Sequence, residues 1–257
     1  MNIYVCIKQV PDTETKIKLN ADQSWIDTSS VKWIMSPYDE FAVEEALRLK
    51  EQNAGSTVTV VSAGPGRVVD TIRTALAMGC DHGLHVDLPE TADCTLAGKA
   101  LSGVLKQQEN VDIIFCGKEA IDDGASQVSQ LLAQYLQMPC VSVVLKAEYS
   151  ANSVVCHREV EGGAIEKIES PLPAVIAAQK GLNEPRYASL PNIMKAKRKE
   201  VKAFTLSDVG VSESDQKIKF KNFQLPPPKS AGKVLEGELE SQAKELVKLL
   251  HEEAKVV

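Results

Sequence analysis

The stretch VDIIFCGKEAIDDGASQVSQLLAQYL, residues 111–136, decides the fold class of this chain. Residues 111–116 are mostly apolar and rich in β-branched side chains, which is typical of a buried strand. A turn rich in Gly and Asp follows directly. Residues 127–136 then repeat apolar side chains at helical spacing, with Leu131, Leu132, Tyr135 and Leu136 facing inward. A strand, a polar turn and a helix in this order predict one unit of a parallel sheet.

The same alternation extends to both sides of this unit. Residues 3–7, 58–61 and 175–178 predict buried strands, and residues 85–86 predict a short one. Ser36 and Pro37 are typical of a helix start, with Ser36 expected to cap it. Apolar periodicity around Ile72 and around Leu101 predicts two more helices. Strands alternating with helices predict a parallel sheet covered on both faces.

The pattern changes after Met138. Residues 141–145, 153–160 and 164–168 predict antiparallel strands, with Gly162 and Gly163 turning the last pair. Residues 183–200 predict a polar loop with a short helix. Three prolines at 226–228 then begin an extended linker, and residues 235–253 predict an amphipathic helix.

We therefore expect an α/β domain at residues 1–222, which includes the loop 183–200, and a C-terminal arm and helix at residues 223–257. The amphipathic terminal helix is well placed to pack on a partner subunit. That it packs on its own domain is an equally open alternative.

Composition excludes several function classes. The chain has 257 residues, is 44% hydrophobic and carries a net charge of −6, which argues against nucleic acid as a partner. No apolar run reaches the about 20 residues that a membrane span needs, so we expect no membrane insertion. The first residues read as a strand and not as a signal peptide, which predicts a cytoplasmic protein.

The cysteines and histidines do not predict a metal site or a catalytic group. The six cysteines form no Cys-x-x-Cys pair, and we expect Cys6, Cys116 and Cys156 to be core residues. No histidine lies in a recognised nucleophile motif. This absence fits a protein whose chemistry belongs to a bound cofactor.

The turn after residues 111–116 is a candidate phosphate site. Ligands of open α/β sheets sit at the carboxyl ends of strands, and the N–H groups of a helix start favour an anion. A structural turn capped by Asp122 or Asp123 explains the pattern equally well. The segment consists of Gly117, Lys118, Glu119, Ala120, Ile121, Asp122, Asp123, Gly124, Ala125, Ser126, Gln127 and Val128.

A second segment, formed by Ser36, Pro37, Tyr38 and Asp39, lies near the end of the first strand-and-loop unit and is a candidate lining of the same crevice. Taken alone, it is also explained as a capped helix start. The turn at residues 63–66 is not Gly-x-Gly-x-x-Gly, and no Walker-type phosphate loop occurs in the sequence. Rossmann dinucleotide binding and P-loop NTPase activity are therefore not favoured.

The loop 183–200 allows two interpretations. Leu190 precedes Pro191 and is followed by Ile193 and Met194, and four basic side chains lie at residues 195–199. An apolar anchor beside steering charges would suit docking to an acidic partner. The alternative is a helix with Leu190, Ile193 and Met194 buried and its lysines in solvent.

Residues 183–197 closely resemble the recognition loop of electron transfer flavoprotein (ETF) β subunits. Residues 31–46, 71–79 and 117–127 are similar to the same family in the same order, and the resemblance runs to about residue 210. The fold expected is α/β, a doubly wound, mostly parallel sheet. It is Rossmann-like and of the adenine-nucleotide-binding type, with an antiparallel β extension and a C-terminal arm and helix.

The resemblance implies cofactors and site residues. The family pairs an ETF α subunit, which holds most of the FAD, with a β subunit that buries a structural AMP. Positions that match the AMP pocket are Cys6, Ser36, Pro37, Tyr38, Asp39, Ala63 and residues 117–128. Leu190 matches the anchor that docks acyl-CoA dehydrogenases, and Glu159 matches an acid that pairs with an arginine of α. The rest of the docking set is Pro191, Ile193, Met194, Lys195, Lys197 and Arg198.

By this resemblance, the chain is an electron carrier subunit and not itself an enzyme, and it works in the cytoplasm, or in the mitochondrial matrix if eukaryotic. It would accept electrons from acyl-CoA and other flavin dehydrogenases and pass them to a membrane ETF:quinone oxidoreductase. Two alternatives stay open. One is an electron-bifurcating ETF β subunit with a second FAD in place of AMP, because Gly124 replaces an acid found in many relatives. The other is a stand-alone nucleotide-binding protein of the universal-stress type.

Overall fold

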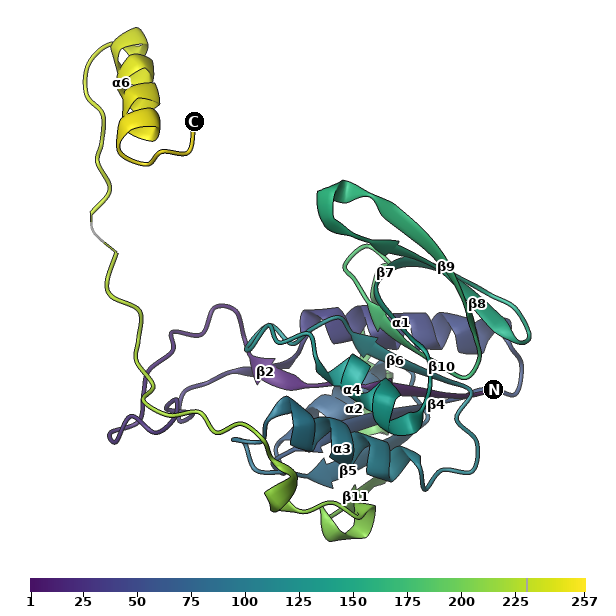
Figure 1. The fold of residues 1–257 in the computed structure, drawn as a ribbon. Helices are drawn as coiled ribbons and strands as arrows, with labels where there is room; N and C mark the ends of the chain where they lie inside the picture. The colour runs from purple at the N-terminus through teal and green to yellow at the C-terminus, as the bar shows by residue number, and fades with distance from the viewer. Residues whose placement is uncertain (230) are drawn as a thin grey trace. The chain divides into compact units, whose positions relative to one another are not determined.

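The computed structural model describes residues 1–229 and 231–257, which form two compact units. The first unit is Met1–Asn222 and the second is Phe223–Val257. The first contains a nine-stranded sheet in the order β11-β5-β4-β1-β6-β10-β7-β8-β9 (Figure 1). Its strands are β1 (Asn2–Cys6), β4 (Thr57–Gly64), β5 (His82–Asp87), β6 (Ile113–Gly117), β7 (Cys140–Tyr149), β8 (Ser153–Glu159), β9 (Ile165–Pro171), β10 (Ala174–Ala178) and β11 (Val201–Phe204).

All neighbours from β11 to β7 pair in parallel, while β8 pairs antiparallel with both β7 and β9. The β8–β9 turn, Glu161–Gly163, places Gly162 and Gly163 at φ values of 79° and 75°, which L side chains rarely adopt. The predicted fold class, a mostly parallel α/β sheet with an antiparallel extension, is confirmed.

Helices cover both faces of the sheet because alternate residues of each strand point in opposite directions. Ile3 and Val5 of β1 belong to the core under α1 (Pro37–Gln52) and α2 (Val68–Met78). Tyr4 and Cys6 belong to the core under α3 (Cys94–Leu105) and α4 (Val128–Leu136). The sheet is therefore doubly wound (Figure 1).

The cysteines predicted to be core residues are buried. Cys6 and Cys116 are each 5% exposed and lie opposite each other on β1 and β6, and Cys156 is fully buried on β8. All six cysteines of the chain are free thiols.

Three strands were not predicted from the sequence. β2 (Gln9–Pro11) and β3 (Trp33–Met35) form a separate antiparallel pair, and β11 adds a parallel edge strand beside β5. Each has three or four residues, which is too short to show an apolar repeat. β5 also runs from residue 82 to residue 87 and so exceeds the predicted 85–86.

The second unit contains α6 (Leu239–Glu252), the amphipathic helix expected from the sequence. None of its residues is buried, and Leu239 and Val247 are 81% and 61% exposed. That this helix packs on a partner subunit stays a prediction.

Candidate functional site

The carboxyl ends of β1 and β6 carry the first candidate site, because these two parallel strands are neighbours in the sheet. Asp39 joins the segments that follow them. Its carboxylate accepts hydrogen bonds from the Lys8 N–H at 2.7 Å and the Gly117 N–H at 2.9 Å. Gly117 is required here, since a Cβ would lie 2.8 Å from the Tyr38 Cβ and collide with Asp39 Oδ1. We call residues 117–128 the strand-end loop.

Asp39 is only 5% exposed, which is unusual for a carboxyl group. Burial raises its pKa to about 7, while the hydrogen bonds from Lys8 and Gly117 act in the opposite direction. The ionised carboxylate can accept both N–H groups at once. The protonation state of Asp39 therefore bears directly on how the two strand ends are held together.

Two lysines offset part of the negative charge of the acids in the strand-end loop. Lys8 Nζ lies 2.8 Å from an oxygen of Asp122 and 2.9 Å from one of Asp123. Lys118 pairs with Glu119 at 3.3 Å and lies 5.1 Å from the centre of the Tyr38 ring. Burial lowers the pKa of Lys8, but the two aspartates outweigh it and the pKa is raised above its usual value.

The start of α4 has no side-chain cap. Its N-cap residue, Gln127, makes no side-chain capping bond, so the N–H groups of the first turn lack that partner. Asp123 caps the turn before this helix, as one of the two predicted candidates, by accepting the Ala125 N–H at 3.0 Å. Ser126 has a φ of 52° and donates its hydroxyl to Glu119 at 2.9 Å. Together these turns hold the loop over the strand ends.

Ser36 differs from its prediction. It is the residue at the start of α1, but its side chain makes no capping bond. Its fully buried hydroxyl instead lies 3.5 Å from the carbonyl oxygen of Glu119. Ser36 therefore faces the strand-end loop and not the N–H groups of its own helix.

The structure brings most of the predicted nucleotide-site residues to one edge of the sheet. Cys6 lies at the end of β1, the segment 36–39 contacts the strand-end loop, and Ala63 lies near the end of the neighbouring β4. The thiol of Cys6 and burial raise the pKa of Cys116 well above its usual value. Lys8 was not predicted, although a lysine directly after the first strand was a signal for it.

The recognition loop, residues 183–200, forms a separate region. It contains α5 (Leu190–Ala196), whose Ser189 cap accepts the Asn192 N–H at 3.4 Å. Leu190 is 79% exposed, Met194 is 56% exposed and Ile193 is 37% exposed. The interpretation that these three are buried is wrong, because the seven-residue helix turns only Ala196 into the core.

Glu159 forms no hydrogen bond to the strand-end loop or the recognition loop among the described residues. It ends β8 and accepts the Gln179 side-chain amide at 3.3 Å. Its predicted partner is on another chain, so its role stays a prediction.

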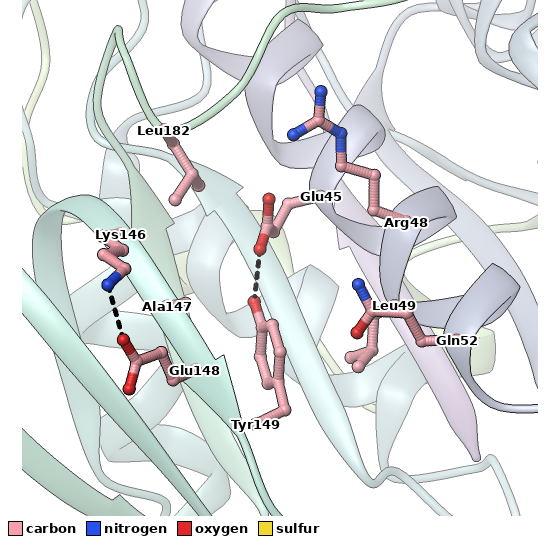
Figure 2. A pocket seen from close by; sticks show the side chains of 9 residues that line it. All are labelled: Glu45, Arg48, Leu49, Gln52, Lys146, Ala147, Glu148, Tyr149 and Leu182. Atoms are coloured by element: carbon pink, nitrogen blue, oxygen red, sulfur yellow. Dashed lines mark hydrogen bonds and ion pairs between the residues drawn. The ribbon is translucent and has the colours of Figure 1, made fainter.

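Two pockets lie away from the strand-end loop and were not predicted. One, of about 240 Å³, lies between α1 and β7, where the Tyr149 hydroxyl donates to Glu45 at 2.9 Å (Figure 2). The other, of about 430 Å³, is lined by residues from the amino ends of β1, β4 and β5.

Within residues 1–229 and 231–257, no group of three or more His, Cys, Asp and Glu side chains could hold a metal ion. Across the same residues, no helix is both long and apolar enough to cross a membrane.

The doubly wound sheet with polar loops at its carboxyl edge defines the class of this protein as a Rossmann-like α/β protein. The profile of the Electron transfer flavoprotein domain matches residues 24–209. The electron transfer flavoprotein subunit beta of Bacillus subtilis is 44% identical over 263 positions, which cover 100% of both chains. The subunit of Mus musculus is 40% identical over 90% of this chain and 91% of its own, and the mitochondrial one of Oryza sativa subsp. japonica is 41% identical over both full lengths.

The chain therefore belongs to the family of electron transfer flavoprotein β subunits. Members of this family are electron-transfer subunits and not catalytic enzymes, and the family is associated with flavin and nucleotide. Because the chain belongs to this family, the alternative of a stand-alone nucleotide-binding protein of the universal-stress type is not favoured.

Proposed function

We propose that this chain is the β subunit of a heterodimeric ETF, in which it holds a structural AMP and docks flavin dehydrogenases. A companion α subunit holds most of the FAD, and this flavin supplies the redox chemistry of the complex. The observation that carries the proposal is the exposed leucine of the recognition loop, Leu190, beside a run of basic side chains. A protein without partner proteins would have no use for an exposed leucine beside a run of basic side chains.

The strand-end loop fits an adenylate. The N–H groups at the start of α4 have no side-chain cap and would hold the phosphate. Lys8 already pairs with Asp122 and Asp123 and offsets part of their negative charge, which lowers the repulsion of an anion. Cys6, Ala63 and the segment 36–39 would line the remainder of the crevice. No redox step falls to the AMP.

The recognition loop would meet acyl-CoA dehydrogenases and similar flavin dehydrogenases. Burying Leu190 in a partner pocket contributes roughly 1.5–3 kcal/mol. Lys195, Lys197 and Arg198 are exposed and would speed the encounter with an acidic partner. Pro191, Ile193 and Met194 extend the apolar contact. The electrons would then pass to a membrane ETF:quinone oxidoreductase.

Contact with the α subunit would come from two other places. Glu159 would pair with an arginine of α near the flavin, and the arm and helix of residues 223–257 would pack on α. We expect the complex in the cytoplasm, or in the mitochondrial matrix if the source is eukaryotic. The relative from rice is named as a mitochondrial subunit.

Counting nucleotides tests this function. The chain is purified together with its companion subunit, the complex is denatured, and the released nucleotides are quantified. One FAD and one AMP per heterodimer is the expected result. Two FAD would instead establish the electron-bifurcating type, and a flavin-free chain without a companion would contradict the proposal altogether.

A further inference from the structure

The first residues of the recognition loop are bound to α1 by a buried carboxylate. Glu44 is 3% exposed and accepts three hydrogen bonds from Arg186. The backbone N–H donates at 3.1 Å, Nε at 2.8 Å and Nη2 at 3.1 Å. Arg186 Nη1 also pairs with Glu51 at 2.5 Å, so the whole guanidinium faces α1. Such a forked ion pair fixes direction as well as distance.

A second acid holds the residue three positions earlier. Glu45, the next residue of α1, accepts the side-chain amide of Asn183 at 3.0 Å. It also accepts the Tyr149 hydroxyl at 2.9 Å, which Figure 2 shows. The Asn183 amide also donates to the Phe41 carbonyl at 2.9 Å. Two consecutive carboxylates of one helix therefore fix the beginning of the loop.

The far end of the loop is attached to α2 and to the turn that follows it. Ala196 is 1% exposed in the core, and Arg73 of α2 donates to the Lys197 carbonyl at 3.2 Å. Lys199 Nζ donates to the Cys80 carbonyl at 2.6 Å. In the part of the chain that the structure describes, residues 187–195 hydrogen-bond only within the loop. The exposed Leu190 thus lies between two attached ends, on a helix that packs against α2.

We propose that the ion pair between Glu44 and Arg186 positions the recognition loop, so that Arg186 controls docking through geometry. The inference rests on the proposed docking function of Leu190. A loop that is fixed before the encounter loses less conformational freedom on binding. If the first residues of the loop are released, they must become ordered again when the partner binds, and docking is weakened. The flavin and nucleotide content of the complex stays the same.

Arg48 supplies a matched control. Its Nε lies 3.0 Å from Glu44 Oε1, one turn along α1, so it neutralises the same carboxylate. Arg48 makes no hydrogen bond to the recognition loop in the described residues. Losing either arginine leaves Glu44 with less compensation, but only the loss of Arg186 frees the loop.

The experiment compares Arg186→Gln, Arg186→Lys and Arg48→Gln in the full heterodimer. The readouts are the apparent KM for the carrier and kcat with a flavin dehydrogenase as electron donor, and the rate of trypsin cleavage at residues 195–198. We expect Arg186→Gln to raise KM and the cleavage rate about tenfold with kcat unchanged. Lysine cannot form the fork, so Arg186→Lys should fall between Gln and wild type. Arg48→Gln should match wild type in both readouts.

Equal changes in KM and in cleavage rate for Arg186→Gln and Arg48→Gln would overturn the inference, because they would show a general loss of stability. Faster cleavage of Arg186→Gln with an unchanged KM would overturn it as well. If Arg186→Gln does not fold, Arg186→Lys and Arg48→Lys replace the pair. Leu190→Ala in the same assay separates the two proposals: an unchanged KM there means that docking by this loop has failed, whereas trypsin cleavage still reports on the ion pair.

Discussion

The strand-end loop and the recognition loop are both polar segments next to a helix start, yet they place their charges in opposite ways. In the strand-end loop, Asp122 and Asp123 turn toward Lys8, and Glu119 pairs with Lys118. In the recognition loop, Lys195, Lys197 and Arg198 are exposed beside an exposed Leu190. A loop whose charged side chains pair with one another suits a small ligand that stays bound, whereas an exposed apolar side chain beside unpaired basic side chains suits a large partner that leaves.

The two loops also differ in how they are attached. The strand-end loop meets the core at Gly117, whose N–H is bound by the buried Asp39. The recognition loop is attached by ion pairs and hydrogen bonds at its ends, and its helix α5 lies against α2 with most of its side chains in solvent. Changes in the first should therefore alter folding and nucleotide content, and changes in the second should alter encounters with partners.

The largest expected effect comes from Gly117→Val. The new Cβ would overlap Asp39 and approach Tyr38 Cβ to 2.8 Å, so the strand-end loop must move. We expect a loss of about 2–4 kcal/mol in the free energy of unfolding, together with loss of AMP. Denaturant unfolding and nucleotide analysis measure both.

Gly124→Ala is the matched control for Gly117→Val. Gly124 has a φ of 57°, but its Cβ would meet nothing within 4 Å. The expected cost is about 1 kcal/mol with AMP retained. Retention of AMP by Gly117→Val would break the link between this loop and the nucleotide.

The next effect is a pH dependence set by Asp39. Its pKa is raised from 3.8 to about 7 by burial, so between these values the folded state binds more protons than the unfolded state. The contribution of Asp39 to the free energy of unfolding therefore falls as pH rises through this window, by up to about 1.4 kcal/mol per pH unit. The Asp39→Asn variant should lack this part of the pH dependence of the free energy of unfolding. Parallel stability curves for the two proteins between pH 4 and 7 would contradict the assignment.

A smaller effect is expected from the basic side chains of the recognition loop. Replacing Lys195, Lys197 and Arg198 together by Gln should slow association with a flavin dehydrogenase about tenfold at low salt. The difference should shrink in high salt, because salt screens exposed charges. Stopped-flow electron transfer at two ionic strengths measures this. AMP content serves as the control and should not change.

The smallest effect is expected from Lys8→Gln. Lys8 pairs with Asp122 and Asp123, but its side chain is 42% exposed, and exposed ion pairs contribute about 0–1 kcal/mol. We expect little change in stability but weaker retention of AMP, since two acids near the phosphate lose their counterion. Equilibrium dialysis with AMP tests this. Tighter binding by the variant would place the phosphate elsewhere.

The sequence predicted the central strands because runs such as residues 3–7 are apolar on both faces, which only a covered parallel sheet requires. It missed β2, β3 and β11, whose pairing depends on neighbours distant in the chain. Ser36 was predicted to cap α1 from local pattern alone, and its partner is Glu119, 83 residues away. Lys8 was missed for the same reason, since Asp122 is 114 residues away.

The exposure of Leu190 was also not decided by pattern. An apolar repeat in a short helix is compatible with burial of Leu190 as well as with its exposure. The tertiary structure places Ala196 in the core and leaves Leu190 in solvent. Glu44 and Glu45 resemble ordinary solvent-facing acids of an amphipathic helix. They are buried because Asn183 and Arg186 return to α1 from another part of the chain.

The most direct measurement is Leu190→Ala in the purified heterodimer, with KM for the carrier and bound nucleotide determined on the same sample. The account predicts a KM raised about tenfold or more, with unchanged kcat, FAD and AMP. An unchanged KM, or a loss of nucleotide on this substitution, would contradict the separation of the two loops.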